Sequence, residues 1–184
     1  MIITISGKPG SGKSTIAKML AEKYNLKKYS TGDFFRAKAR EKGLSLHEYS
    51  VLAEQEAEHD NETDLWQTQL GKRENNFIID GRLSHKFIPN AIKIFLDVDK
   101  NIGAMRIMNE KRDGEQAMDE KHALHLWEVR ASSEQKRFHE YYKIDHHDFS
   151  QYDFVLDTSN LTKQEVLEKI SGFITKHHLF DKTP

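Results

Sequence analysis

Short apolar runs alternate with longer stretches of helical periodicity along this chain. Runs rich in Ile, Val, Phe and Leu predict buried strands at residues 2–6, 77–79, 92–98 and 152–157, and residues 27–30 predict a short further strand. The first helix is indicated by apolar residues that recur at helical spacing, namely Ile16, Met19, Leu20 and Tyr24. Strands that alternate with helices in this way predict an α/β fold, in which a parallel sheet carries helices on both faces.

Two long segments interrupt this alternation. Residues 34–74 are rich in Ala, Glu, Lys and Arg, and Ser45 with Glu48 has the spacing of a capping box, which predicts a helix start. Residues 101–142 are also helical in pattern and heavily charged. A second capping box, Thr162 with Glu165, begins the last helix, whose apolar side carries Val166, Ile170, Phe173 and Ile174. No repeat or linker is present in the sequence, so we expect one domain with two helical excursions.

Composition excludes several classes of protein. Lys and Arg number 28 against 29 Asp and Glu, and this balance argues against binding of nucleic acid or an anionic membrane through bulk charge. The absence of cysteine excludes disulfides, thiolate metal sites and cysteine nucleophiles. The apolar runs are far shorter than the roughly eighteen residues that span a bilayer, and the first residues lack the basic region of a signal peptide. We expect a cytoplasmic protein that acts as a monomer.

Residues 7–14, Gly-Lys-Pro-Gly-Ser-Gly-Lys-Ser, match the phosphate-binding pattern G-x-x-x-x-G-K-[ST] between a strand and a helix. Its glycines let several backbone N–H groups point at one phosphate, and the helix adds its positive amino end. Lys13 can reach the β- and γ-phosphates, and the Ser14 hydroxyl can ligate Mg²⁺. The alternative is a glycine-rich turn without a ligand. The expected ATP site comprises Gly7, Lys8, Pro9, Gly10, Ser11, Gly12, Lys13, Ser14 and Thr15. Because the N-K-x-D motif of GTPases does not occur, a small kinase is favoured.

A second anion site is indicated by Ser-Thr-Gly-Asp-Phe-Phe-Arg at residues 30–36. Hydroxyls and amides at a helix start, with Arg36 one turn in, can bind a phosphate, although an ordinary capped helix is the alternative. The third strand ends at Asp80-Gly81-Arg82. Asp80 has the position of an acid close to Mg²⁺ and its waters, and Arg82 lies at the end of the strand where α/β proteins bind ligands. Two phosphate sites and one magnesium site predict transfer between two phosphorylated compounds.

The sequence resembles the nucleoside monophosphate kinases, and most closely the archaeal-type cytidylate kinases, at residues 7–15, 30–36, 80–83 and 157–159. The resemblance implies a P-loop NTPase fold with a five-stranded parallel sheet in the order 2-3-1-4-5. It also implies a core (1–35, 75–108 and 131–184), a monophosphate-binding insert at about 36–74 and a lid at about 109–130.

Two sets of residues bear on recognition of cytosine. Asp60 and Asp64 lie four apart, where the family has paired acids, and a carboxylate can accept a hydrogen bond from the cytosine amino group. The alternative is a solvated acidic helix. Arg130, Glu134 and Arg137 have the spacing of cytidylate kinases and share one helix face, with a surface salt-bridge ladder as the alternative. The implied monophosphate site is Thr31, Gly32, Arg36, Asp60, Asp64, Gly81, Arg82, Glu134 and Arg137; the implied catalytic cations are Lys13, Arg112, Arg130 and Arg137.

The resemblance implies that ATP and CMP, and also dCMP, react to give ADP and the diphosphate, with Mg²⁺ held by Ser14 and, through water, by Asp80. The attacking phosphate has a second pKa near 6, so it needs no strong general base. One rival is a kinase that acts on AMP or UMP. Another is an adenylate-kinase-like ATPase that assists ribosome assembly, which the near-neutral charge disfavours because such a protein needs a basic RNA-binding surface. The expected partners are therefore small nucleotides, without nucleic acid or membrane.

Overall fold

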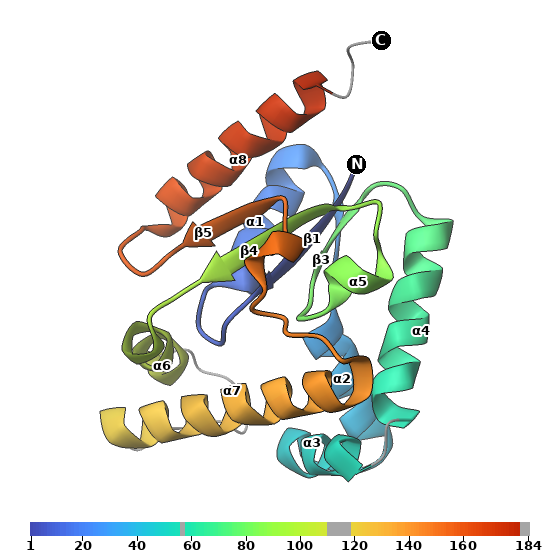
Figure 1. Cartoon of the computed structure of the whole chain (residues 1–184), viewed down its shortest axis with the longest axis vertical. Helices are drawn as coiled ribbons and strands as arrows, with labels where there is room; N and C mark the ends of the chain where they lie inside the picture. Colours follow the sequence, from blue (N-terminus) through green and yellow to red (C-terminus); the bar gives the residue numbers. More distant parts are fainter. Residues whose placement is uncertain (56–57, 110–118, 181–184) are drawn as a thin grey trace.

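A five-stranded parallel sheet forms the centre of the computed structural model, which describes residues 1–55, 58–109 and 119–180 (Figure 1). Its strands are β1 (Ile2–Gly7), β2 (Lys27–Ser30), β3 (Phe77–Asp80), β4 (Ile92–Asp97) and β5 (Phe154–Asp157). Their order is β2-β3-β1-β4-β5, and every neighbouring pair is parallel. The predicted α/β fold and strand order are confirmed.

Helices connect the strands, as parallel pairing requires. They are α1 (Lys13–Tyr24), α2 (Thr31–Glu41), α3 (Leu46–Gln55), α4 (Glu58–Arg73), α5 (Ser84–Phe87), α6 (Lys100–Asn109), α7 (Glu120–Tyr142) and α8 (Lys163–Phe180), with a short 3₁₀ turn at Phe149–Gln151. Both predicted capping boxes form. The Glu48 amide donates to Ser45 Oγ at 3.2 Å and the Ser45 amide to Glu48 Oε2 at 2.7 Å, and Thr162 and Glu165 exchange the equivalent bonds.

The core lies on both faces of the sheet because alternate residues of each strand point to opposite sides. In β1, Ile3 and Ile5 pack with α1 and α8 on one face, whereas Ile2 packs with α4 on the other. The predicted apolar side of α8 is buried at Val166, Ile170 and Ile174. Its fourth residue, Phe173, is partly buried and stacks on Phe154 of β5, with the ring centroids 4.7 Å apart.

The parallel arrangement brings the carboxyl ends of all strands to one edge. In Figure 1, the arrows of β4 and β5 point toward the end of the molecule where α6 and α7 lie. Between β2 and β3, α2, α3 and α4 occupy the predicted insert, and the limits of the insert and lid stay predictions. Of the predicted lid, residues 110–118 lie outside the described structure and residues 119–130 lead into and form the first half of α7. None of the described helices is long and apolar enough to cross a membrane.

Candidate active site

The phosphate-binding loop joins β1 to α1, and Gly12 caps the amino end of that helix. The Lys13 ammonium folds back over the loop, where it donates to the carbonyl oxygens of Gly7 at 2.9 Å and Lys8 at 2.7 Å. Burial, together with the nearby Arg82 guanidinium, lowers the pKa of Lys13 well below its usual value. Lys13 is thus a desolvated cation held by two weak acceptors. Ser14 is exposed in the first turn of α1, and Thr15 beside it is half-buried.

The loop is also fastened to β4. The Lys8 ammonium forms an ion pair with Asp97 at 2.7 Å, and the Lys8 amide donates to the Leu96 carbonyl at 3.2 Å. Sequence reasoning missed Asp97. The signal was available, because Asp97 ends β4 in the same way that Asp80 ends β3, and both strands pair with β1.

Asp80 lies at the carboxyl end of β3, with its side chain only 4% exposed. Its Oδ2 atom has no hydrogen-bond partner among the described residues. The adjoining Gly81 permits a close approach, because a Cβ atom there would lie 2.3 Å from Ser84 Oγ and 2.6 Å from Thr31 Cγ2. The Thr31 hydroxyl in turn donates to the Asp80 carbonyl at 3.3 Å. The end of β3 and the start of α2 therefore meet, which brings together two motifs that are separate in the sequence.

Arg82 links the phosphate-binding loop to α7. Its Nε and Nη2 atoms donate to the two oxygens of Glu134 at 2.5 and 3.2 Å, and Nη1 donates to the Gly7 carbonyl at 2.7 Å. Arg130 approaches the same carboxylate at 3.3 Å. Burial alone would raise the pKa of Glu134, but the guanidinium groups of Arg82 and Arg130 hold this pKa far below its usual range. Lys13, Arg82 and Arg130 thus lie near the Glu134 carboxylate, and Asp80 adds a second carboxylate where β3 ends.

Of the other predicted arginines, Arg36 and Arg137 lie toward the insert. Arg36 forms an ion pair with Asp33 on its own helix, and its guanidinium lies against Gly32, where an added Cβ would be 3.5 Å from Nη1. The Arg137 guanidinium lies 5.7 Å from the ring centroid of Phe35 and 5.4 Å from that of Phe138. Arg137 therefore faces α2 across the space between α7 and the insert.

The predicted base-recognition acids both lie on α4, with Asp60 one turn before Asp64. The Asp64 carboxylate is half-buried and accepts a hydrogen bond from the Tyr142 hydroxyl at the end of α7. No sequence signal pointed to Tyr142, which is 78 residues away. Arg112 lies outside the described residues. The structure therefore groups the loop, Asp80, Arg82, Arg130 and Glu134, and it places Arg36, Asp64 and Arg137 along the insert.

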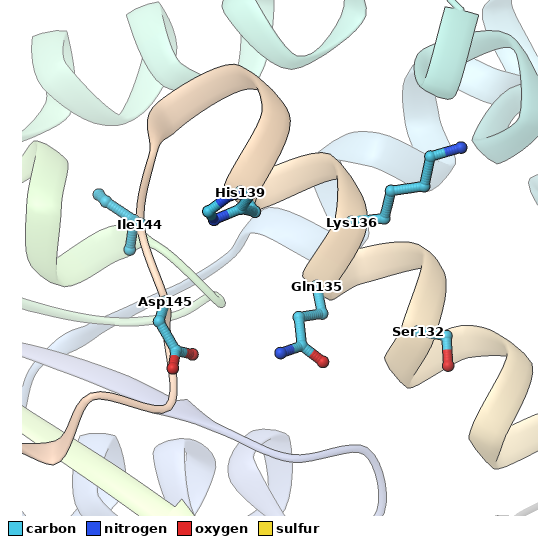
Figure 2. Close-up of a pocket in the computed structure, with 6 residues that line it drawn as sticks. All are labelled: Ser132, Gln135, Lys136, His139, Ile144 and Asp145. Carbon is cyan, nitrogen blue, oxygen red and sulfur yellow. The ribbon is translucent and has the colours of Figure 1, made fainter.

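A pocket of about 530 Å³ follows a different face of α7 (Figure 2). It is lined by Ser132, Gln135, Lys136, His139, Ile144 and Asp145. In Figure 2, Gln135 on the helix and Asp145 on the loop that follows it lie on either side of the opening. These α7 residues do not coincide with the face that carries Arg130, Glu134 and Arg137, so the pocket is separate from the charged cluster.

Comparison with known proteins identifies the family of this chain. A sequence profile of the cytidylate kinase-like family matches residues 2–160. The chain belongs to this family. Its curated relatives include the cytidylate kinase of Methanocaldococcus jannaschii, 41% identical over 95% of this chain and 97% of the relative. The cytidylate kinase of Archaeoglobus fulgidus is 36% identical over 92% of each chain. Membership confirms the predicted resemblance and the enzyme class, a nucleoside monophosphate kinase that uses a nucleotide phosphate donor.

Solved structures support the fold. An uncharacterized protein from Eubacterium ventriosum superposes with a TM-score of 0.69 at 23% identity, covering 95% of this chain and 98% of that one. Shikimate kinase from Bacteroides thetaiotaomicron gives 0.68 at 14% identity with the same coverage. At these identities the likeness concerns the fold alone. This member of the cytidylate kinase-like family therefore shares its α/β fold with a shikimate kinase.

Proposed function

We propose that this protein transfers the γ-phosphoryl group of ATP to CMP and to dCMP. The observation that carries the proposal is the group of Lys13, Arg82 and Arg130 around Glu134, beside the phosphate-binding loop. Such a group can bind phosphate groups of two nucleotides side by side. CMP is proposed as the acceptor because the relatives named cytidylate kinase match nearly the whole chain.

The reaction needs little covalent help from the protein. An ionised oxygen of the CMP phosphate attacks the γ-phosphorus, a new P–O bond forms, and the bond from that phosphorus to the β–γ bridging oxygen breaks to release ADP. The loop amides and Lys13 bind the donor phosphates. Arg82 and Arg130, with Arg36 and Arg137 from the insert side, bring the acceptor phosphate into line and stabilise the charge of the transferring group.

The residues present fit a magnesium ion. Asp80 offers a buried carboxylate oxygen without a hydrogen-bond partner in the described chain, and Ser14 offers an exposed hydroxyl at the start of α1. Oxygen ligands of this kind suit Mg²⁺, with Asp80 acting through water. When bound with ATP, the ion supplies positive charge at the β- and γ-phosphate oxygens.

Asp64 is the residue that we propose recognises the cytosine base. A carboxylate accepts from the cytosine amino group but repels the carbonyl oxygen that uracil has at that position, so UMP leaves acceptors unpaired. Adenine also has an amino group, but its larger ring system crowds a site sized for a pyrimidine. We expect CMP and dCMP to be preferred to UMP and AMP.

A coupled assay with ATP and each of these monophosphates tests the proposal directly. The expected result is the highest kcat/KM for CMP and dCMP, with little ATP hydrolysis when no acceptor is present. If AMP were the best acceptor, the cytidylate assignment would be wrong while the monophosphate kinase class would stand. ATP hydrolysis that is independent of any monophosphate would instead favour the assembly ATPase.

A further inference from the structure

A tryptophan far away in the sequence is bonded to the phosphate-binding loop. The Trp127 indole Nε1 of α7 donates to the Pro9 carbonyl oxygen at 2.9 Å, across 118 positions of the chain. Pro9 is buried and Trp127 is half-buried, so water competes little for this bond. The motif explains neither residue's contact, because position 9 is one of its unrestricted places and α7 lies outside it.

The surrounding backbone is shaped around this hydrogen bond. A Cβ atom added at Gly103 of α6 would lie 2.8 Å from the Pro9 oxygen and 2.8 Å from the indole nitrogen, so only glycine there lets the two atoms meet. Gly10, the second residue of this peptide, has a φ of +73°, and its added Cβ would lie 2.2 Å from the Gly103 carbonyl oxygen. The peptide between Pro9 and Gly10 is thus clamped between α6 and α7.

The direction of that peptide decides where one donor of the loop points. In a trans peptide the C=O and N–H groups point in opposite directions. A carbonyl held toward α7 therefore turns the Gly10 N–H toward the interior of the loop. Converging backbone N–H groups are what make such a loop bind phosphate. We propose that Trp127 is a positioning residue for the donor nucleotide, because its indole N–H holds the Pro9 carbonyl outward and so aims the Gly10 N–H at a donor phosphate.

This inference rests on the proposed binding of the donor at the loop, and it makes a prediction specific to the donor. Trp127→Phe keeps an aromatic ring but removes the N–H. We expect the affinity for ADP, measured by isothermal titration calorimetry, to fall about fivefold to tenfold, as for the loss of one neutral hydrogen bond. In the kinase assay the KM for ATP rises by a similar factor while the KM for CMP is unchanged.

The only other tryptophan provides the matched control. Trp66 of α4 stacks on Phe34 with the ring centroids 4.6 Å apart, in the insert and away from the loop. Trp66→Phe removes the same chemical group and should leave the affinity for ADP unchanged. A second variant, Gly103→Ala, keeps Trp127 in the sequence but puts a Cβ atom 2.8 Å from both bonded atoms, so it should also weaken ADP binding.

The N–H itself can be tested even if Trp127→Phe folds poorly. Benzothienylalanine, in which sulfur replaces the indole N–H at nearly constant shape, is incorporated at position 127 in the Trp66→Phe background. The same loss of ADP affinity is expected. ADP affinity equal to that of the parent, or equal losses of ADP and CMP affinity, would overturn the inference. Failure of the unmodified protein to bind ADP would instead overturn the donor site on which the inference depends.

Discussion

Lys13 donates to two backbone carbonyls of its own loop, and phosphate oxygens are far better acceptors for a desolvated ammonium than neutral carbonyls. The pKa of Lys13 is lowered because burial and the nearby cation Arg82 both disfavour the charged form of Lys13. A bound polyphosphate reverses this balance by supplying negative charge at the ammonium. We therefore expect Lys13 to contribute more to phosphoryl transfer than to folding.

Lys13→Ala should reduce kcat by about a hundredfold or more, since a contact to the transferring group is often worth about 3 kcal/mol. The circular dichroism spectrum and the thermal midpoint should change little. Lys18→Ala is the matched control, because Lys18 lies on the same helix with its side chain 73% exposed. Near-normal turnover of Lys13→Ala would mean that the phosphate-binding loop has been misassigned.

Arg82 and Arg36 should separate acceptor binding from donor binding. If both hold the CMP phosphate, changing either to Ala weakens CMP affinity far more than ADP affinity in separate calorimetric titrations. Arg82→Ala carries an additional cost of about 3 kcal/mol in unfolding free energy, because it leaves the largely buried Glu134 carboxylate, 13% exposed, without its two-bond partner. Arg36→Ala carries no such cost, since its partner Asp33 is exposed. Equal losses for both nucleotides would contradict the assignment to the acceptor.

Among the secondary-structure elements, α4 and α7 are joined at the base-recognition site. The Tyr142 hydroxyl of α7 donates to Asp64 of α4, while the Tyr142 ring packs edge-on against Phe87 at 5.9 Å and lies under the Lys86 ammonium at 4.6 Å. These contacts hold the Tyr142 ring in place, and the Tyr142 hydroxyl in turn orients one oxygen of the Asp64 carboxylate. Tyr142 of α7, which lies outside the insert, therefore orients Asp64, the proposed specificity residue of the insert.

Tyr142→Phe should therefore lower the ratio of kcat/KM for CMP to that for UMP by about threefold to tenfold, the range for one hydrogen bond. Tyr141→Phe is the control, because the neighbouring hydroxyl donates to the Ala53 carbonyl at 3.4 Å and not to Asp64. In an Asp64→Asn background, Tyr142→Phe should have little further effect on the ratio. Additive effects of the two substitutions would show that Tyr142 does not act through Asp64. A ratio that Asp64→Asn leaves unchanged would show that Asp64 does not recognise the base.

At the scale of the whole molecule, local patterns predicted the fold well. The strand order came from the resemblance, and the capping boxes at Ser45 and Thr162 came from spacing alone. Three predicted strands end one residue away from the observed ends, and the largest difference is at the start of the last strand. The last strand begins at Phe154 instead of residue 152, because the Tyr152 amide closes the preceding turn on the Phe149 carbonyl at 3.2 Å and its hydroxyl bonds the His146 carbonyl.

The candidate site was predictable in its motifs but not in the contacts that orient them. The phosphate-binding loop is one continuous segment of the sequence, and so is the strand end Asp80-Gly81-Arg82. Each could therefore be recognised from the spacing of its own residues. The bonds of Trp127 to Pro9 and of Tyr142 to Asp64 join residues more than 70 positions apart. Such pairs depend on how α7 crosses the sheet edge, and no local periodicity encodes that crossing.

Stability of the whole molecule should fall in mild acid because of a buried histidine. His146 is 3% exposed and packs against the Phe138 ring at 5.1 Å. Burial, with His147 and Arg82 nearby, lowers the pKa of His146 to about 3. In the unfolded chain the pKa is about 6.5, so as the pH falls below that value the unfolded state takes up a proton that the folded state refuses.

The stabilisation from neutral His146 is therefore complete above the unfolded pKa and is lost progressively as the pH falls toward the folded one. At about pH 5 this residue alone should cost about 2 kcal/mol of unfolding free energy relative to about pH 8. Burial also lowers the pKa of His85 and of His147, so these residues add to the wild-type slope. Urea unfolding of His146→Gln at both pH values isolates the contribution, since the difference at about pH 8 measures lost packing and only the further difference at about pH 5 measures protonation. A variant whose stability falls between the two pH values as much as that of the wild type would show that His146 is protonated in the folded protein, and that its burial against Phe138 does not keep it neutral.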